Sequence, residues 1–328
     1  MQLIASPRSR FHRYRIKHFT PLFVSILLAV SFIVFAITNQ YSASTPVSAG
    51  TAGQRTLRVL VIDLDPNLPS RGNQRTSAFL GQSADVDLSV SELVEDLEYG
   101  SNGKLDVSIV AREQLNEFTT FKSTITLKNG TTSHRLDEET WLEIMKDGWH
   151  ASWSNPYFTQ IPDFDFDYSY FVDRLNLVER RNNNEFDQVW LVNTGPTNNY
   201  ESMMVGSAAY WINGPALIRP TTNFAIMNVS VARRDVNLEC FGHAAENIMT
   251  KVFKGSRIAV AGSSGLTPFT GNISELNLWE RFTSSELSFP SHASVGSVHF
   301  APNSSRDLRN HLWLHKTQKT QNHSPRQG

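Results

Sequence analysis

The stretch LRVLVID at residues 57–63 is a short aliphatic run with a Val/Ile centre, which is typical of a buried β-strand. A helical pattern follows it. Ser89 and Glu92 form a capping box ahead of apolar residues at helical spacing, and Gly100 stands where such a helix would end. Residues 105–110 (LDVSIV) then predict a second strand. A strand, a helix and a strand in this order indicate an α/β fold.

The alternation continues farther along the chain. Residues 187–193 (DQVWLVN) and 224–229 (FAIMNV) predict two more strands, and residues 236–253 (VNLECFGHAAENIMTKVF) predict the longest helix. The shorter predicted elements are a Thr-rich edge strand or hairpin arm at 119–127 and helices at 137–146 and 168–180. We therefore expect a single α/β domain over residues 57–314, with a mixed central sheet and helices packed on it.

Composition limits the possible function classes. A domain of this length can bury a full core without disulfides. Cys240 is the only cysteine, which excludes an internal disulfide and a cysteine-based zinc or redox site. The chain is 40% hydrophobic and 19% charged, with a formal net charge of -1. This balance offers no basic footprint for nucleic acid, so we expect no nucleic-acid partner.

The N-terminus predicts a membrane anchor. Residues 21–38 (PLFVSILLAVSFIVFAIT) carry no charge. As a helix they would span about 27 Å, close to the roughly 30 Å hydrocarbon core of a bilayer. Basic residues, and no acids, precede this run within the first 17 residues. The positive-inside rule then predicts a cytoplasmic basic segment at 1–18 and a transmembrane signal anchor at 19–38, with the main domain extracytoplasmic.

Polar segments flank the expected domain. Residues 39–56 are rich in Ser, Thr, Ala and Gly and predict a flexible stalk. Residues 315–328 are polar and predict a disordered tail. The alternative to an anchor is a signal peptide cleaved after Ala43 or Ala49, which would release a secreted protein. The apolar run is longer than the roughly 7–15 residues of a signal peptide, which favours the single-pass membrane protein.

The main chemical pattern lies in ECFGHAAE, residues 239–246. On a helix, Glu239, His243 and Glu246 fall within about 60° of one another. His243 and Glu246 are three residues apart and can reach one metal ion, but such a pair needs a third ligand from elsewhere. We identify His299, in VGSVHFAPN, as that ligand. His-x-x-Glu with a distant His resembles the zinc ligand set of the carboxypeptidase class of metallopeptidases, which implies zinc bound by His243, Glu246 and His299.

Two carboxylates are candidates for catalysis at this site. Glu239 or Glu201 would be the base that activates bound water. The pattern thus predicts a zinc-dependent hydrolase, peptidase- or amidase-like, with a peptide or cell-wall substrate. However, the apolar stripe of the same helix lies roughly opposite Glu239, His243 and Glu246, which is also typical of a solvated surface helix. In that case we expect a non-catalytic extracytoplasmic module that binds a cell-surface glycan or protein.

Two further segments follow predicted strands. Residues 193–213 (NTGPTNNYESMMVGSAAYWIN) predict a loop, and ligands of α/β sheets bind beyond the carboxyl ends of strands. An ordinary loop pinned by aromatic residues is the alternative. Asp63-Leu64-Asp65 resembles the nucleophile motif of haloacid-dehalogenase-type phosphatases, although Pro66-Asn67 replaces the usual Gly-Thr pair. Two acids that end a strand are also common in turns.

Three segments share a wider resemblance. Residues 186–213, residues 238–249 (LECFGHAAENIM) and residues 297–303 (SVHFAPN) resemble an uncharacterised family of secreted bacterial proteins. The resemblance implies that the three segments belong to one domain, and it favours bacterial export. It implies no activity.

Overall fold

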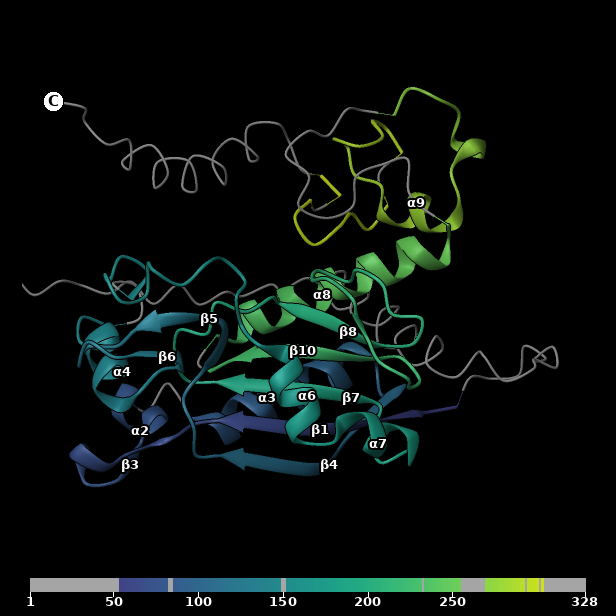
Figure 1. Ribbon diagram of the computed structural model, residues 1–328. Helices are drawn as coiled ribbons and strands as arrows, with labels where there is room; N and C mark the ends of the chain where they lie inside the picture. The colour runs from purple at the N-terminus through teal and green to yellow at the C-terminus, as the bar shows by residue number, and fades with distance from the viewer. Residues whose placement is uncertain are drawn as a thin grey trace, which may run out of the picture.

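The computed structural model describes residues 53–81, 85–148, 152–231, 233–254, 269–292, 294–300 and 302–303. The expected cytoplasmic segment, anchor and tail, and the stalk up to residue 52, lie outside these ranges. Within them, no helix is long and apolar enough to cross a membrane. The described elements form a mixed α/β fold (Figure 1).

A six-stranded mixed sheet forms the centre of the fold, with strand order β4-β1-β7-β10-β8-β9. Its strands are β1 (Arg55–Leu64), β4 (Leu105–Leu115), β7 (Gln188–Asn193), β8 (Ser202–Gly206), β9 (Leu217–Ile218) and β10 (Phe224–Ser230). The first four in sheet order run parallel, and β8 pairs antiparallel to β10. The strands predicted from the aliphatic runs are therefore confirmed. Because the parallel strands all end on one side, their carboxyl ends share an edge, called the carboxyl edge below.

Helices cover both faces of this sheet (Figure 1). They are α3 (Val86–Gly100) and α8 (Arg234–Val252) on one face, and α6 (Tyr168–Arg174) and α7 (Leu177–Asn182) on the other. Side chains of β1 alternate between the two cores, with Val59 and Val61 on the α3/α8 side and Leu60 and Ile62 on the other. This two-sided burial explains why β1 reads as a continuous apolar run.

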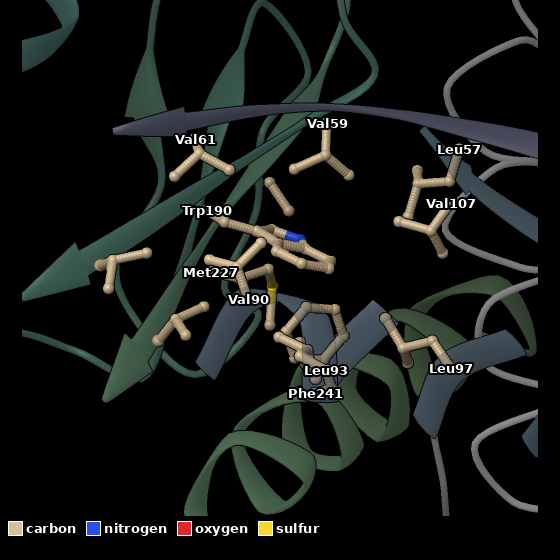
Figure 2. Packing of buried hydrophobic residues seen from close by; sticks show 14 of the residues in the cluster. Leu57, Val59, Val61, Val90, Leu93, Leu97, Val107, Trp190, Met227 and Phe241 are labelled. Atoms are coloured by element: carbon tan, nitrogen blue, oxygen red, sulfur yellow. The ribbon is translucent and has the colours of Figure 1, made fainter. Parts of the chain in front are cut away.

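Trp190 lies at the centre of the core under α3 and α8. Figure 2 shows its indole surrounded by strand side chains and by Leu93 and Phe241 from the two helices. The rings of Trp190 and Phe241 meet edge to face, with centroids 5.7 Å apart. Phe241 and Ile248 of the apolar stripe predicted on the long helix thus pack on the sheet, whereas Ala245 of that stripe packs against Phe282 and Val295 on the other side and Val252 is half exposed.

Helix boundaries differ from the prediction at two places. Asp85, rather than Ser89, caps α3, because the Asp85 side chain accepts a hydrogen bond from the Leu88 N–H. The helix ends at Gly100, as predicted. The single helix predicted over 168–180 is divided into α6 and α7, because Asn176 adopts a left-handed backbone with φ of 51°.

A smaller hydrophobic cluster lies beside the sheet. It is formed mainly by a hairpin and one helix: β5 (Thr120–Thr126), β6 (Thr132–Arg135) and α4 (Glu138–Met145). The predicted hairpin arm and the predicted helix at 137–146 are therefore confirmed. The remaining short elements are β2 (Asn67–Leu68), η1 (Pro69–Arg71), β3 (Gln74–Arg75), α2 (Thr76–Leu80), η3 (Ile273–Glu275) and α9 (Leu278–Thr283).

The segment 193–213 was predicted to be a loop, which is wrong for its middle. Residues 202–206 form β8, all five of them buried. The sequence SMMVG has neither the alternation of a half-buried strand nor many β-branched residues. Pairing with β10 makes it a strand, so tertiary contacts override a weak local preference.

Residues 269–292 and 294–300 cover the side of α8 that faces away from the sheet. The Trp279 indole N–H donates to the Thr250 hydroxyl at 3.3 Å, and Phe282 and Val295 pack against Ala245. Helix α8 is therefore enclosed between the sheet and this segment (Figure 1). The alternative of a solvated helix face is wrong for its central turns, where His243 is 5% exposed and Glu246 is fully buried.

Candidate metal centre

Three side chains from two distant segments converge beside α8. Glu239 and His243 lie one turn apart on the helix, and His299 comes from the covering segment. Glu239 Oε1 is 3.7 Å from His243 Nε2 and 3.8 Å from His299 Nε2. The two imidazole centroids are 4.6 Å apart. One ligand atom of each residue lies within 4.8 Å of the others, so this His/Glu cluster can hold a metal ion.

The spacing of these atoms is close to that of a formed site. Zinc bonds to nitrogen and oxygen are about 2.0–2.2 Å long, so atoms at two corners of a tetrahedron are about 3.4 Å apart. The two carboxylate–imidazole distances, 3.7 and 3.8 Å, exceed this value by only a few tenths of an ångström. The three ligand atoms as a set lie within 4.8 Å of one another, so movements of about an ångström would complete three corners. The donor set of two imidazoles and one carboxylate suits zinc, but also other divalent transition metals.

Glu201, predicted as a possible base, lies at this cluster. Its Oε2 is 3.9 Å from His243 Nε2, and the Asn213 side-chain amide donates to the same oxygen. The residue immediately precedes β8, and its carbonyl accepts from the Asn228 N–H at 2.9 Å, at the end of β10. Glu201 thus stands on the carboxyl edge of the sheet, where ligands of α/β folds usually bind.

Glu246, predicted as a metal ligand, has different contacts. It is fully buried, and its Oε1 accepts from the Val298 N–H at 2.7 Å. Its Oε2 is buried and has no hydrogen-bond partner among the described residues. Burial raises the pKa of this carboxyl to about 8, although the Val298 N–H and His243 act in the opposite direction. The carboxylate that joins the two histidines is therefore Glu239.

A glycine on α8 allows this covering segment to approach. A Cβ atom at Gly242 would lie 2.5 Å from Val298 Cγ2, closer than such atoms can come. Gly242 is inside a helix and is therefore needed for space rather than for its backbone angles. Gly242 and Glu246 both contact Val298, and both thereby fix the position of the next residue, His299.

His243 is buried and its pKa is raised, whereas the acids Glu201 and Glu239 beside it are partly exposed. Burial lowers the pKa of His243, but the hydrogen bond with Glu239 and the charges of Glu201 and Glu246 outweigh it, and the net pKa is raised. The His243 side chain is 7% exposed, whereas those of Glu201 and Glu239 are 41% and 42% exposed. One side of the cluster is therefore open to solvent.

Three aromatic side chains lie close together next to Glu201 in the chain or in contact with its neighbour Tyr200. Tyr200 stacks on Phe164 with centroids 4.4 Å apart and planes 9° apart, and meets Trp211 edge to face at 5.9 Å. We call these three residues the aromatic shelf. Trp211 and Phe164 are 53% and 48% exposed. The segment 193–213 thus supplies both Glu201 and two rings of the shelf.

A second polar cluster lies on the carboxyl edge, at the end of β1. Asp63 is paired with Arg112 at 2.7 Å, and Asp65 with Arg75 at 3.2 Å. The hydroxyls of Thr76 and Ser77 also donate to Asp65, at 2.7 and 2.6 Å. Burial raises the pKa of Asp63, partly offset by the hydrogen bond from Arg112. These contacts favour the structural alternative for the Asp-x-Asp motif over a phosphatase nucleophile.

Two residues of the site were not predicted from a sequence motif. Asn213 donates a hydrogen bond to Glu201, and Gly242 leaves space for Val298. A lone glycine inside a predicted helix was the available signal for a close approach, since glycine is disfavoured there without a packing reason. The chain matches no protein-family model, and no curated protein matches it at a significant level.

Proposed function

We propose that the protein is a membrane-tethered, extracytoplasmic, metal-dependent hydrolase, peptidase- or amidase-like, with zinc as its metal. The observation that carries the proposal is the convergence of Glu239, His243 and His299 within 4.8 Å. His299 lies about 60 residues after Glu239 in the sequence. The two histidines are those singled out by the sequence pattern. The tether rests on the uncharged run at residues 21–38.

The roles follow from the positions of the four polar side chains. Glu239, His243 and His299 would hold the ion, which would supply an acidified water when bound. Bound zinc lowers the pKa of water to near 7. Glu201 accepts the proton of the attacking water and returns it to the leaving nitrogen, while the Asn213 amide keeps its carboxylate in place. In balance, one water is consumed, the C–N bond breaks, and a carboxylic acid and an amine are released.

Metal analysis of the purified full chain tests the proposal. We expect about one zinc ion per chain, and an affinity at least about a hundredfold lower for His243→Ala, because a two-ligand site binds zinc weakly. His299→Ala should behave in the same way. His292→Ala is the matched control, since His292 is exposed in the same covering segment and stacks on Phe289. Absence of stoichiometric zinc in the wild type, or equal binding by His243→Ala, would exclude the metal centre.

The second candidate function is a non-catalytic extracytoplasmic module that binds a cell-surface glycan or protein. The half-exposed rings of Trp211 and Phe164 favour it. Turnover separates the two candidates. A hydrolase loaded with zinc should release amines from amide substrates, and Glu201→Gln should lower kcat by about 100-fold or more while zinc stays bound. A module should bind its ligand without any release, with or without zinc.

A further inference from the structure

The aromatic shelf combines two features that each reduce stability. Trp211 and Phe164 expose about half of their surface to water, although aromatic rings gain free energy from burial. Phe164 also has a left-handed backbone, with φ of 59°. For a bulky residue this conformation is strained, and such outliers cluster at functional sites. Strain and exposure at one residue indicate that the position of this ring serves a function.

Contacts around the shelf hold it in place. The Tyr168 hydroxyl donates to the Tyr200 carbonyl at 3.0 Å, and the Asn198 amide donates to the Pro162 carbonyl at 2.5 Å. Gly214 lies against the Tyr200 ring, where a Cβ atom would be 2.8 Å from Cγ. The rings therefore belong to a preformed surface, which lowers the entropic cost of binding a ligand.

The shelf is linked to the candidate metal centre by neighbouring residues in the chain. Tyr200 directly precedes Glu201, whose carboxylate lies 3.9 Å from His243. Trp211 is two residues from Asn213, which donates to the same carboxylate. A ligand that extends from the shelf past Glu201 would thus reach the metal ligands. The acids Glu201 and Glu239, both about two-fifths exposed, supply hydrogen-bond acceptors beside His243.

We propose that the aromatic shelf binds a pyranose ring of a glycan. An apolar peptide side chain gains most from an enclosed pocket, because an open surface leaves one side of it in water. A pyranose has a C–H face that can lie on an aromatic ring and a rim of hydroxyls that water and carboxylates can satisfy. An open shelf that includes Tyr200, the neighbour of Glu201, matches this chemistry. Stacking on rigid rings also requires few ordered side chains.

The inference rests on the proposed function for one consequence. With the ring on the shelf, the bond at the metal centre belongs to an amide or ester substituent of the sugar. Hydrolysis would consume one water, break the C–N or C–O bond, and leave the proton on the released amine or hydroxyl. The substrate class is therefore an acylated or peptide-linked glycan of a cell surface.

Binding to the shelf can be measured without metal. We would titrate the full chain in EDTA with chitotetraose and with cellotetraose, and with an apolar peptide of similar mass, by calorimetry and tryptophan fluorescence. Trp211→Ala should weaken oligosaccharide binding about tenfold, because it removes one stacking partner. Trp153→Ala is the matched control, since Trp153 is 52% exposed and contacts Phe158 outside the shelf. Trp211→Phe, which keeps a ring, should recover most of the affinity.

The outcomes separate this inference from the proposed function. Saccharide binding that Trp211→Ala loses and Trp153→Ala keeps supports the shelf, whether or not zinc binds. Binding of the peptide but of neither saccharide overturns the glycan assignment, even if the zinc-loaded protein is a hydrolase. Equal losses in Trp211→Ala and Trp153→Ala overturn the location. The circular dichroism spectrum of each variant verifies that it is folded.

Discussion

Two polar clusters lie on the carboxyl edge of one sheet, and their acids differ in what faces them. At the end of β1, the buried acids Asp63 and Asp65 are paired with the guanidinium groups of Arg112 and Arg75. At the start of β8 and on α8, the half-exposed acids Glu201 and Glu239 face His243, and Glu239 also faces His299. A guanidinium is always charged, whereas an imidazole can lose its proton and become a metal ligand.

The comparison shows why the position of acids at strand ends does not by itself predict chemistry. Both clusters occupy the edge where α/β sheets usually bind ligands. Near β1, the arginines neutralise the acids from within the protein, and the network ties α2 to the sheet. Near α8, an imidazole neutralises a neighbouring carboxylate only when the imidazole is protonated, so a metal cation can take the place of that proton. The first cluster therefore contributes to stability, and the second is suited to binding.

Disruption of each cluster in turn tests whether the first contributes to stability and the second to metal binding. Asp65→Ala removes the acceptor of Arg75, Thr76 and Ser77. It should lower the free energy of unfolding by about 3–5 kcal/mol, because it leaves the buried Thr76 hydroxyl and the partly buried Arg75 and Ser77 without this acceptor. Zinc affinity of the folded fraction should not change. His243→Ala should show the opposite pattern, with zinc binding lost and unfolding of the metal-free protein little changed. Chemical denaturation and zinc titration measure the two quantities.

If Asp65→Ala also abolished zinc binding at temperatures where the variant is folded, the two clusters would be coupled. A chain that unfolds completely when His243 is replaced would give the α8 cluster a mainly structural role. Either result would contradict the division proposed for the two ends of the carboxyl edge.

The pH dependence of stability tests whether Glu246, beside the α8 cluster, is protonated in the folded protein. Its pKa is about 8 in the folded protein, against an ordinary value of 4.5. Between these values the unfolded chain has released a proton that the folded chain retains, so stability must fall as pH rises. From pH 5 to 7 this contribution is at most about 3 kcal/mol. Denaturation of the metal-free protein across this range, compared with Glu246→Gln, isolates it. Identical pH slopes in both proteins would show that Glu246 is ionised in the fold.

The role of Glu246 in metal binding can be tested with two substitutions. Glu246→Gln retains an oxygen that accepts the Val298 N–H, whereas Glu246→Leu does not. If Glu246 positions His299, zinc affinity should be nearly normal in the first variant and about 10–100-fold lower in the second. The control is Glu98→Leu, which also removes an acceptor of a backbone N–H, that of Val107, but far from the site in sequence. A large loss in Glu246→Gln would instead assign Glu246 as a direct ligand, as the sequence pattern predicted.

Gly242→Ala is expected to have the smallest effect. The new methyl group would overlap Val298 Cγ2 and shift the covering segment by a few tenths of an ångström or more. The gain in helix propensity, about 1 kcal/mol, partly offsets the overlap, so stability should change by about 1 kcal/mol or less. Zinc affinity should nevertheless fall several-fold, because His299 moves with Val298. The absorption spectrum of the cobalt-substituted protein reports this change in ligand geometry. An unaltered spectrum and affinity would mean that Val298 yields without moving His299.

Part of the candidate site could be predicted from sequence. Glu239 and His243 are one helical turn apart, and their proximity follows from helix geometry alone. His299 and Glu201 were predicted as partners, and both lie at the cluster. The sequence pattern predicted Glu246 as the carboxylate ligand, whereas Glu239 lies with the two histidines. Helix geometry could not separate the two acids, because both share a helix face with His243. The answer depends on where residues 294–300 cross α8, since Val298 takes up one oxygen of Glu246.

Local sequence was enough to determine the alternation of β1, α3 and β4 and the helical register of α8, because hydrophobic periodicity and capping act over a few residues. The presence of one cysteine is read directly from the sequence. Tertiary structure decided that residues 202–206 form a strand, that the polar side of α8 is enclosed, and that one acidic cluster meets arginines and the other histidines. These outcomes depend on contacts between residues far apart in the chain, such as Glu201 with His243 and Glu246 with Val298, which no local pattern specifies.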